Sequence, residues 1–220
     1  MLSAGLVGQT PLRSVIKAMK LHWSPRSPFV RKVMIFAHET GLADQLDCVR
    51  TVVAATAANA DLLGENPLSK IPTLVLDGGT VLYDSAVICE YLDTLHGGAK
   101  LFPPEGPPRW MALRRQALGD GFLDLLILWR YERGRAQPLQ SLIDAFGAKY
   151  QAALRSLEQE AASLAGTPFG IGHIAIGCSL SYLDFRFPHL LWRDGHPQIA
   201  AWHASFAQRP SVKATEPVDD

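Results

Sequence analysis

The chain has 220 residues, with 21 basic and 21 acidic side chains and a formal net charge of zero. At roughly 150 residues per domain, this length predicts one large domain, or a small domain joined to a medium one. A hydrophobic fraction of 48% with only 19% charged residues excludes a largely disordered chain. Zero net charge argues against nucleic acid as a partner, and the sequence has no apolar run of the roughly 18 residues that a membrane span needs.

The three cysteines, Cys48, Cys89 and Cys178, do not have the spacing of metal ligands. We expect them to be buried thiols in a reducing compartment, which predicts a cytoplasmic protein. Residues 1–18 precede a second methionine, Met19, and lack the unbroken apolar segment of a secretory signal. We therefore expect residues 1–18 to be an extension outside the fold, either a dispensable arm or the result of a start codon placed too far upstream.

Residues 19–97 predict a small α/β domain with a mixed sheet, because strand and helix patterns alternate along them. The expected elements are, in chain order, a strand at 20–23, a helix from Phe29 to Gly41, a strand at 48–53, a short helix at 56–63, an antiparallel hairpin joined through Gly78 and Gly79, and a helix from Ser85.

The composition changes after this domain. Residues 98–108 are rich in proline and glycine, which predicts a linker. Residues 109–220 predict an all-helical domain, because apolar residues there recur with the period of a helix. We expect its helices at 109–134, 138–165, 171–187 and 197–208.

Two features of the first domain go beyond fold. Ser27 and Ser24 precede a helix whose unpaired N–H groups and dipole favour an anion such as a thiolate, although both serines are equally suited to simple capping. Pro72 stands directly before a strand, and a cis Ile71–Pro72 bond would leave the Ile71 backbone free to pair with an extended ligand. A trans proline at a strand entrance is the alternative. Asp84 offers an ordinary helix cap.

Together these motifs resemble the glutathione S-transferase superfamily over about 200 residues. The resemblance rests on SPFVRKV (27–33), NPLSKIPTLVLDGG (66–79), DSAVICEYL (84–92) and IAIGCSLSYLDFR (174–186). It implies a thioredoxin-like N-terminal domain followed by an all-α C-terminal domain. The closest branch is the cytosolic, bacterial, serine-type one with SPFVRK after the first strand.

The resemblance also implies roles for individual residues. Ser27 is the expected catalytic residue, with Ser24 as the alternative, because related branches place a Tyr, Ser or Cys at the start of this helix. The expected glutathione contacts are Phe29, Lys70, Ile71, the cis Pro72, Asp84 and Ser85. Branches that work by thiol exchange have Cys at the position of Ser27, so serine implies stabilisation of the glutathione thiolate.

The implied function is a glutathione transferase that acts on a small apolar electrophile. The alternative is a non-catalytic glutathione-binding, ligand-binding or regulatory protein on the same fold. Glutathione is then a co-substrate, no cofactor or metal is expected, and the resemblance alone implies a homodimer. Trp129, Arg130 and Arg133 are candidates for the electrophile pocket, or else core and surface residues.

Three other patterns carry less weight. His189, His196 and His203 are spaced by seven, but prolines and a glycine break the run, so we expect no shared metal. Asp120 and Asp124 lie one helical turn apart, which favours a polar face at the domain boundary or a dimer seam over paired catalytic acids. Gly170 and His173 replace the family's Ser/Thr-x-x-Asp cap of the sixth helix, a loss that the fold should tolerate.

Overall fold

The computed structural model of the chain describes residues 18–219. The prediction for residues 1–18 falls outside that range except at Ala18. The elements are β1 (Met19–Trp23), α1 (Pro28–Glu39), β2 (Leu46–Arg50), α2 (Ala60–Leu63), β3 (Thr73–Val75), β4 (Val81–Leu82), α3 (Ser85–Thr94), α4 (Gly106–Arg133), α5 (Gln140–Ala165), α6 (Ile171–Arg186), α7 (Pro197–Ala207) and α8 (Pro210–Lys213), with 3-10 turns at Ala43–Gln45 and Pro188–Leu190.

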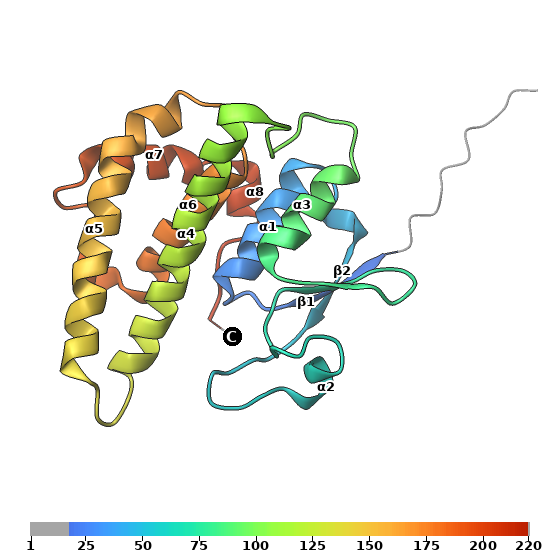
Figure 1. The fold of residues 1–220 in the computed structure, drawn as a ribbon, viewed down its shortest axis with the longest axis horizontal. Coiled ribbons are helices and arrows are strands. Elements are labelled where there is room, and N and C mark those ends of the chain that lie inside the picture. Colours follow the sequence, from blue (N-terminus) through green and yellow to red (C-terminus); the bar gives the residue numbers. More distant parts are fainter. Residues whose placement is uncertain (1–17, 220) are drawn as a thin grey trace, which may run out of the picture.

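The four strands form one sheet, which is mixed as predicted, and their order is β2-β1-β3-β4. β1 is parallel to β2 and antiparallel to β3, and β3 is antiparallel to β4. The sheet and α3 lie beside α1, and the long helices α4 and α5 stand on the other side of the molecule (Figure 1). The fold is therefore a thioredoxin-like domain followed by an all-helical domain.

One hydrophobic core runs through both domains. In the first domain it includes Leu21 of β1, Leu74 of β3 and Ile88 of α3, all fully buried. The core continues from the first domain toward the helical domain at Phe36 of α1. Its ring centroid lies 5.9 Å from that of Phe102, just before α4. The two domains therefore share buried apolar surface.

Helix α6 is the centre of the helical domain, with every residue from Ile171 to Leu183 buried. Its neighbours approach closely at glycines. A Cβ added at Gly119 of α4 would lie 2.5 Å from the backbone of Ala175, and one at Gly177 would lie 2.2 Å from the Phe206 ring. Gly172 likewise allows close packing, because an added Cβ would lie 2.7 Å from the Arg115 side chain of α4.

Ion pairs at two points of α1 join it to the helical domain. The Lys32 side chain is fully buried and its Nζ lies 2.7 Å from both carboxylate oxygens of Asp120 on α4. At the other end of α1, Glu39 accepts hydrogen bonds from Arg209 at 2.6 and 2.9 Å and from Ser211. These contacts fix α1, and whatever its N-terminus binds, against the second domain.

Several element boundaries differ from the sequence prediction. β2 ends at Arg50 because it pairs residue by residue with the five-residue β1. α4 begins at Gly106, inside the predicted linker, because prolines fit the first turn of a helix. The predicted helix at 56–63 is reduced to Ala60–Leu63, and α8 was not predicted.

The prediction of three buried thiols is wrong for one of them. Cys89 and Cys178 are buried, but Cys48 is exposed because it lies on the edge strand β2. No helix within residues 18–219 is both long enough and apolar enough to cross a membrane.

Candidate active site

The candidate site lies at the edge of the sheet where β1 and β4 end and β3 begins. Because β1 is antiparallel to β3 and β3 to β4, the residues that follow β1, precede β3 and follow β4, among them Ser24, Ile71 and Ser85, lie at the same edge of the sheet. The sheet therefore gathers into one row three segments that are separated by more than ten residues in the sequence.

Ser27 caps the N-terminus of α1. Its Oγ accepts a hydrogen bond from the Val30 N–H at 3.3 Å, and Pro28 fills the first turn, where a missing N–H costs nothing. Within the described residues, neither the Ser27 hydroxyl hydrogen nor the Phe29 N–H has an acceptor. These two donors and the positive end of the helix dipole suit an anion in front of α1.

Ser24 belongs to the same turn but is less accessible. It is 5% exposed, whereas Ser27 is half-buried. The Ser24 Oγ accepts a hydrogen bond from the Arg26 N–H at 3.4 Å, and its carbonyl accepts one from the Ser27 N–H at 3.2 Å. Of the two serines, Ser27 is the one that lies at the start of the helix.

The Ile71–Pro72 peptide bond is cis, which confirms that prediction. The Ile71 side chain packs against Val30 and Leu62. Its backbone N–H and C=O make no hydrogen bond to any residue between 18 and 219, whereas the Lys70 carbonyl accepts two side-chain hydrogen bonds. The Ile71 backbone can therefore pair with an added extended chain, as an edge strand would.

Asp84 and Ser85 stand at the N-terminus of α3. The Asp84 Oδ1 accepts a hydrogen bond from the Ala86 N–H at 3.0 Å, so the acid caps the helix. Ser85 is 2% exposed, and neither its N–H nor its hydroxyl contacts a hydrogen-bond partner in the described chain. An exposed carboxylate next to unpaired donors suits a ligand group that carries both an ammonium and a carboxylate.

Lys70 is exposed at the domain boundary, near α4. Burial raises the pKa of Asp124 on α4, and the charge of Lys70 opposes that rise. Burial likewise raises the pKa of Asp120, against the charge of Lys32. The two aspartates of α4 thus form a polar face at the domain boundary, which is the structural interpretation that their spacing favoured.

A pocket opens beside Ser27, between the start of α1, the C-terminal half of α6 and the last described residues of the chain. Its walls also include Arg26, Arg31, Cys178, Tyr182, Phe185 and Pro217. The free space in it is about 10 Å³, close to what a single water molecule needs. The final segment of the chain lies beside the start of α1 (Figure 1), and Pro217 of this segment forms one wall of the pocket.

The three residues predicted for the electrophile pocket are spread over two places. Trp129 is 6% exposed inside the helical domain, with Phe187 stacked on its ring and Arg133 over both rings. None of the three residues lines the pocket beside Ser27. Arg130 contacts one of its walls, through a hydrogen bond of 3.4 Å to the Tyr182 hydroxyl.

The cysteines offer no thiolate to this site. Cys178 borders the pocket, but burial raises its pKa to about 11. Burial also raises the pKa of Cys89 and of Cys48. Because a thiol reacts as its thiolate, the hydroxyl of Ser27 is the better candidate for the chemistry here.

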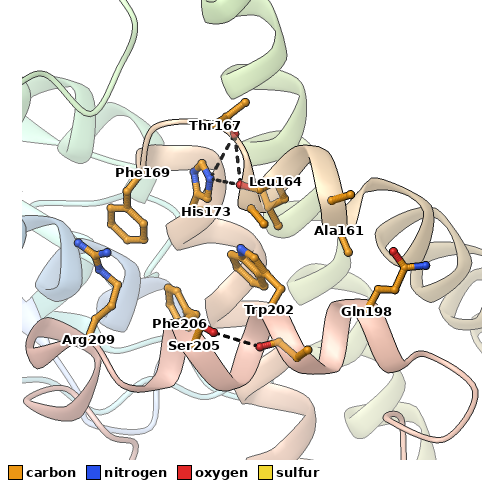
Figure 2. A pocket seen from close by; sticks show the side chains of 13 residues that line it. Ala161, Leu164, Thr167, Phe169, His173, Gln198, Trp202, Ser205, Phe206 and Arg209 are labelled. Atoms are coloured by element: carbon orange, nitrogen blue, oxygen red, sulfur yellow. Dashed lines mark hydrogen bonds between the residues drawn. The ribbon is translucent and has the colours of Figure 1, made fainter.

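A larger groove of about 660 Å³ lies on the helical domain and is separate from this site. Figure 2 shows the rings of Phe169, Trp202 and Phe206 along it, with the Arg209 guanidinium 3.6 Å from the Phe169 ring centroid. All of its lining residues lie between 161 and 209. The groove therefore shares no residue with the row of Ser24, Ile71 and Ser85.

His173 replaces the acidic member of the usual cap of α6. Its Nδ1 accepts a hydrogen bond from the Gly170 N–H at 3.2 Å, and its Nε2 donates to the Leu164 carbonyl at 2.9 Å (Figure 2). Burial lowers the pKa of His173, which favours this neutral form. Half of the reciprocal cap is thus retained, although the sequence suggested that it was lost.

The described residues hold no group of three or more His, Cys, Asp or Glu side chains suited to a metal ion. The three histidines spaced by seven have unrelated partners. His189 contacts Arg133, His196 contacts the Trp192 carbonyl, and His203 contacts Ser181.

Comparison with known proteins matches both domains to one family. Residues 26–95 match the glutathione S-transferase N-terminal domain, and residues 140–205 match the glutathione S-transferase C-terminal domain. The GST-like protein YibF of Escherichia coli K12 is 30% identical over 206 residues, which cover 90% of this chain and 98% of that protein. The chain belongs to the glutathione S-transferase family.

Solved structures agree with this assignment. A glutathione transferase family member from Pseudomonas fluorescens Pf-5, with bound glutathione, is 44% identical with a TM-score of 0.88, covering 92% of this chain and all of that one. A second structure from that organism, with bound S-(propanoic acid)-glutathione, is 43% identical with a TM-score of 0.84 and the same coverage.

Sequence reasoning missed the residues that border the pocket opposite Ser27. Tyr182 and Phe185 lie on a helix that is apolar on most sides, so periodicity gives no sign of which face meets the site. The tail residues, Pro217 among them, have no periodic pattern at all. Only the charge of Arg186 and Asp219 could have suggested that the tail is held in place.

Proposed function

We propose that this chain is a glutathione transferase in which the Ser27 hydroxyl and the N-terminus of α1 stabilise the thiolate of bound glutathione. The observation that carries the proposal is that Ser27 and Phe29 keep two unpaired donors at the end of a helix dipole. The Ile71 side chain packs against Val30 of the same helix, which supports placing the two donors near the Ile71 backbone. A peptide paired with Ile71 would present its sulfur to them.

The remaining contacts follow from the same row of residues. The Ile71 N–H and C=O would pair with the cysteinyl backbone of glutathione, as an added strand does. Asp84 would take the γ-glutamyl ammonium, and the N–H and hydroxyl of Ser85 would take the adjacent carboxylate. Lys70 would approach the other carboxylate, and Pro72 holds the turn.

Beyond these contacts, the proposed reaction needs few further protein groups. The bound thiol loses its proton to solvent, and the thiolate sulfur forms a bond to an electrophilic carbon. In a substitution the leaving group departs with its bonding electron pair, and in an addition to an alkene the displaced π pair takes a proton from water. The two structures of the Pseudomonas relative, one with bound glutathione and one with a bound glutathione conjugate, support this interpretation of the site.

One observation favours the alternative, a non-catalytic glutathione-binding or regulatory protein. The pocket beside Ser27 has free space of only about 10 Å³, so an electrophile enters only if the tail moves. The homodimer and the cytoplasmic location that the family resemblance implies are part of the proposal and remain predictions.

The test compares Ser27→Ala with Ser24→Ala. We expect Ser27→Ala to lower kcat/KM for conjugation of 1-chloro-2,4-dinitrobenzene by about a hundredfold, as the loss of one preorganised donor does. Ser24→Ala should change it by less than about threefold, because that hydroxyl is buried behind the turn. Retention on immobilised glutathione should persist in both variants.

The pH profile separates a thiolate role from a general loss of folding. In Ser27→Ala the apparent pKa of the bound thiol should rise toward the free value of about 8.5, while Ser24→Ala should leave it unchanged. Equal rates and equal profiles for the two variants would sink the serine mechanism. Binding without turnover of any electrophile would support the non-catalytic alternative.

A further inference from the structure

The pocket beside Ser27 is surrounded by arginines from three elements. Arg26, in the turn before α1, and Arg31 of α1 line the pocket; Arg186 follows the lining residue Phe185 at the end of α6, and Arg130 of α4 donates a hydrogen bond to the lining residue Tyr182. A chain with no net charge thus concentrates positive charge at one point of its candidate active site. Such a concentration favours an anionic ligand.

Three of these arginines converge on one carboxylate, that of Asp219. Arg186 binds it with two parallel hydrogen bonds of 2.8 and 3.0 Å, and Arg26 Nη1 lies 3.9 Å away. The hydrogen bond from Arg186 lowers the pKa of Asp219, and the charges of Arg26 and Arg130 add to this. The geometry is that of a bidentate carboxylate site.

The carboxylate that fills this site is easily displaced. The Asp219 side chain is 58% exposed and belongs to the tail after α8, so its ion pair is of the weak, solvent-screened kind. Pro217, two residues earlier, borders the pocket that contains Ser27. An apolar residue followed by a carboxylate therefore lies where a ligand of the same character would bind.

Arg31 adds an independent observation. It is 8% exposed, borders the same pocket, and makes one hydrogen bond, to the Val212 carbonyl at 3.3 Å. Its buried Nε has no partner, and no described carboxylate lies within ion-pair distance of it. An unpaired buried cation is costly unless a ligand supplies the counter-charge.

We propose that the electrophile carries a carboxylate, which Arg26 and Arg186 bind at the place that Asp219 occupies, with Arg31 deeper in the pocket. The proposal rests on the transferase function and names its substrate class. Two residues of chain span at most about 7 Å, so the carboxylate lies a few bonds from the carbon that the sulfur attacks. The tail then acts as an internal competitor for the substrate.

A matched pair of product analogues tests this directly. S-(2-carboxyethyl)glutathione and S-propylglutathione have side chains of similar length and differ in the carboxylate. By isothermal titration calorimetry, we expect the full chain to bind the carboxyethyl conjugate about tenfold more tightly. The double variant Arg26→Gln/Arg186→Gln should lose that preference and keep its affinity for S-propylglutathione.

A substitution in the tail should raise the affinity that the arginine substitutions lower. Asp219→Asn removes the competitor, so it should increase affinity for the carboxyethyl conjugate and leave S-propylglutathione unaffected. Arg155→Gln, at an exposed position on α5, is the control for the loss of positive charge in the arginine variants and should alter neither affinity. Melting temperatures confirm that each variant is folded.

The outcomes separate the two levels of the proposal. If glutathione binds but the two conjugates bind equally, or if Asp219→Asn weakens the carboxyethyl conjugate, the substrate class is wrong and the glutathione site stands. If glutathione and both conjugates fail to bind to the folded protein, the proposed function fails as well.

Discussion

At the scale of single residues, Ser27 caps α1 and is also the residue proposed to stabilise the thiolate. The free energies of these two roles differ. As the cap of α1 its hydroxyl oxygen accepts the Val30 N–H, and losing such a cap costs about 1 kcal/mol. A protein with a typical stability of about 5–15 kcal/mol stays folded after that loss. A hundredfold loss of activity in Ser27→Ala would therefore report on the hydroxyl donor and not on unfolding.

The cysteines give a second test at this scale. Cys48 is exposed, whereas Cys89 and Cys178 are at most 1% exposed with raised pKa values. We expect a thiol reagent such as Ellman's to titrate about one thiol in the native chain and about three after denaturation. Cys48→Ser should abolish the native reaction.

A second reactive thiol in the native Cys48→Ser variant would contradict this packing. Because Cys178 borders the pocket, it would also mean that the tail opens often enough to admit the reagent.

Sequence alone could predict those candidate site residues whose backbone conformation depends on their immediate neighbours in the chain. The Ile71–Pro72 pair and the two helix starts at Ser27 and Asp84 are such positions, and each has the predicted backbone. Trp129 shows the limit. Its amphipathic environment on α4 is compatible with a core or a cleft, and only the packing of the neighbouring helix decides between them.

At the scale of elements, the close contact between α4 and α6 depends on missing side chains, that of Gly119 among them. Gly119→Ala should destabilise the protein by about 3 kcal/mol, because the new methyl group would lie 2.5 Å from the Ala175 backbone, which cannot move alone. Gly121 lies two residues further along the same helix, and a Cβ added there would have no atom within 4 Å.

Gly121→Ala is therefore the matched control, and it should be neutral or stabilising by up to about 1 kcal/mol. Urea unfolding curves of the two variants would measure both changes in the free energy of unfolding. Equal effects of the two substitutions would show that α4 and α6 are less closely packed than described.

The sequence predicts best those helices that bury a single stripe of apolar side chains. The predicted stripe of α5 is buried from Phe146 through Leu164. Elements whose length depends on a partner are predicted worst. β2 takes its limits from β1, and the pocket-facing side of α6 cannot be recognised because the whole helix is buried.

At the scale of the whole molecule, acid should weaken the fold before the carboxylates titrate. Burial lowers the pKa of His203 to about 4 and also lowers that of His173, against an ordinary value of 6.5. Both are neutral in the native state and protonate earlier in the unfolded chain. Their contribution to stability is complete above about pH 6.5 and is lost as the pH falls toward 4.

Glu39 adds a loss at lower pH. Burial acts to raise its pKa, but the hydrogen bonds from Arg209 and Ser211 lower it overall, so its contribution disappears only below its ordinary value of 4.5. We expect the free energy of unfolding to fall from pH 7.5 to 5, and more steeply below. His203→Gln should flatten the first part of the curve. A flat curve in the wild type would contradict this account.

The two halves of the candidate site come from different domains, and this division affects how such a protein diverges. The residues proposed for glutathione lie between Ser27 and Ser85, whereas Tyr182, Phe185 and Arg186 belong to α6. Substitutions at the partly buried end of α6, at Phe185 and Arg186, or in the tail can therefore change the substrate side without touching the residues proposed for glutathione. A lineage of such proteins could acquire new substrates through these few positions while the first domain keeps the shared chemistry.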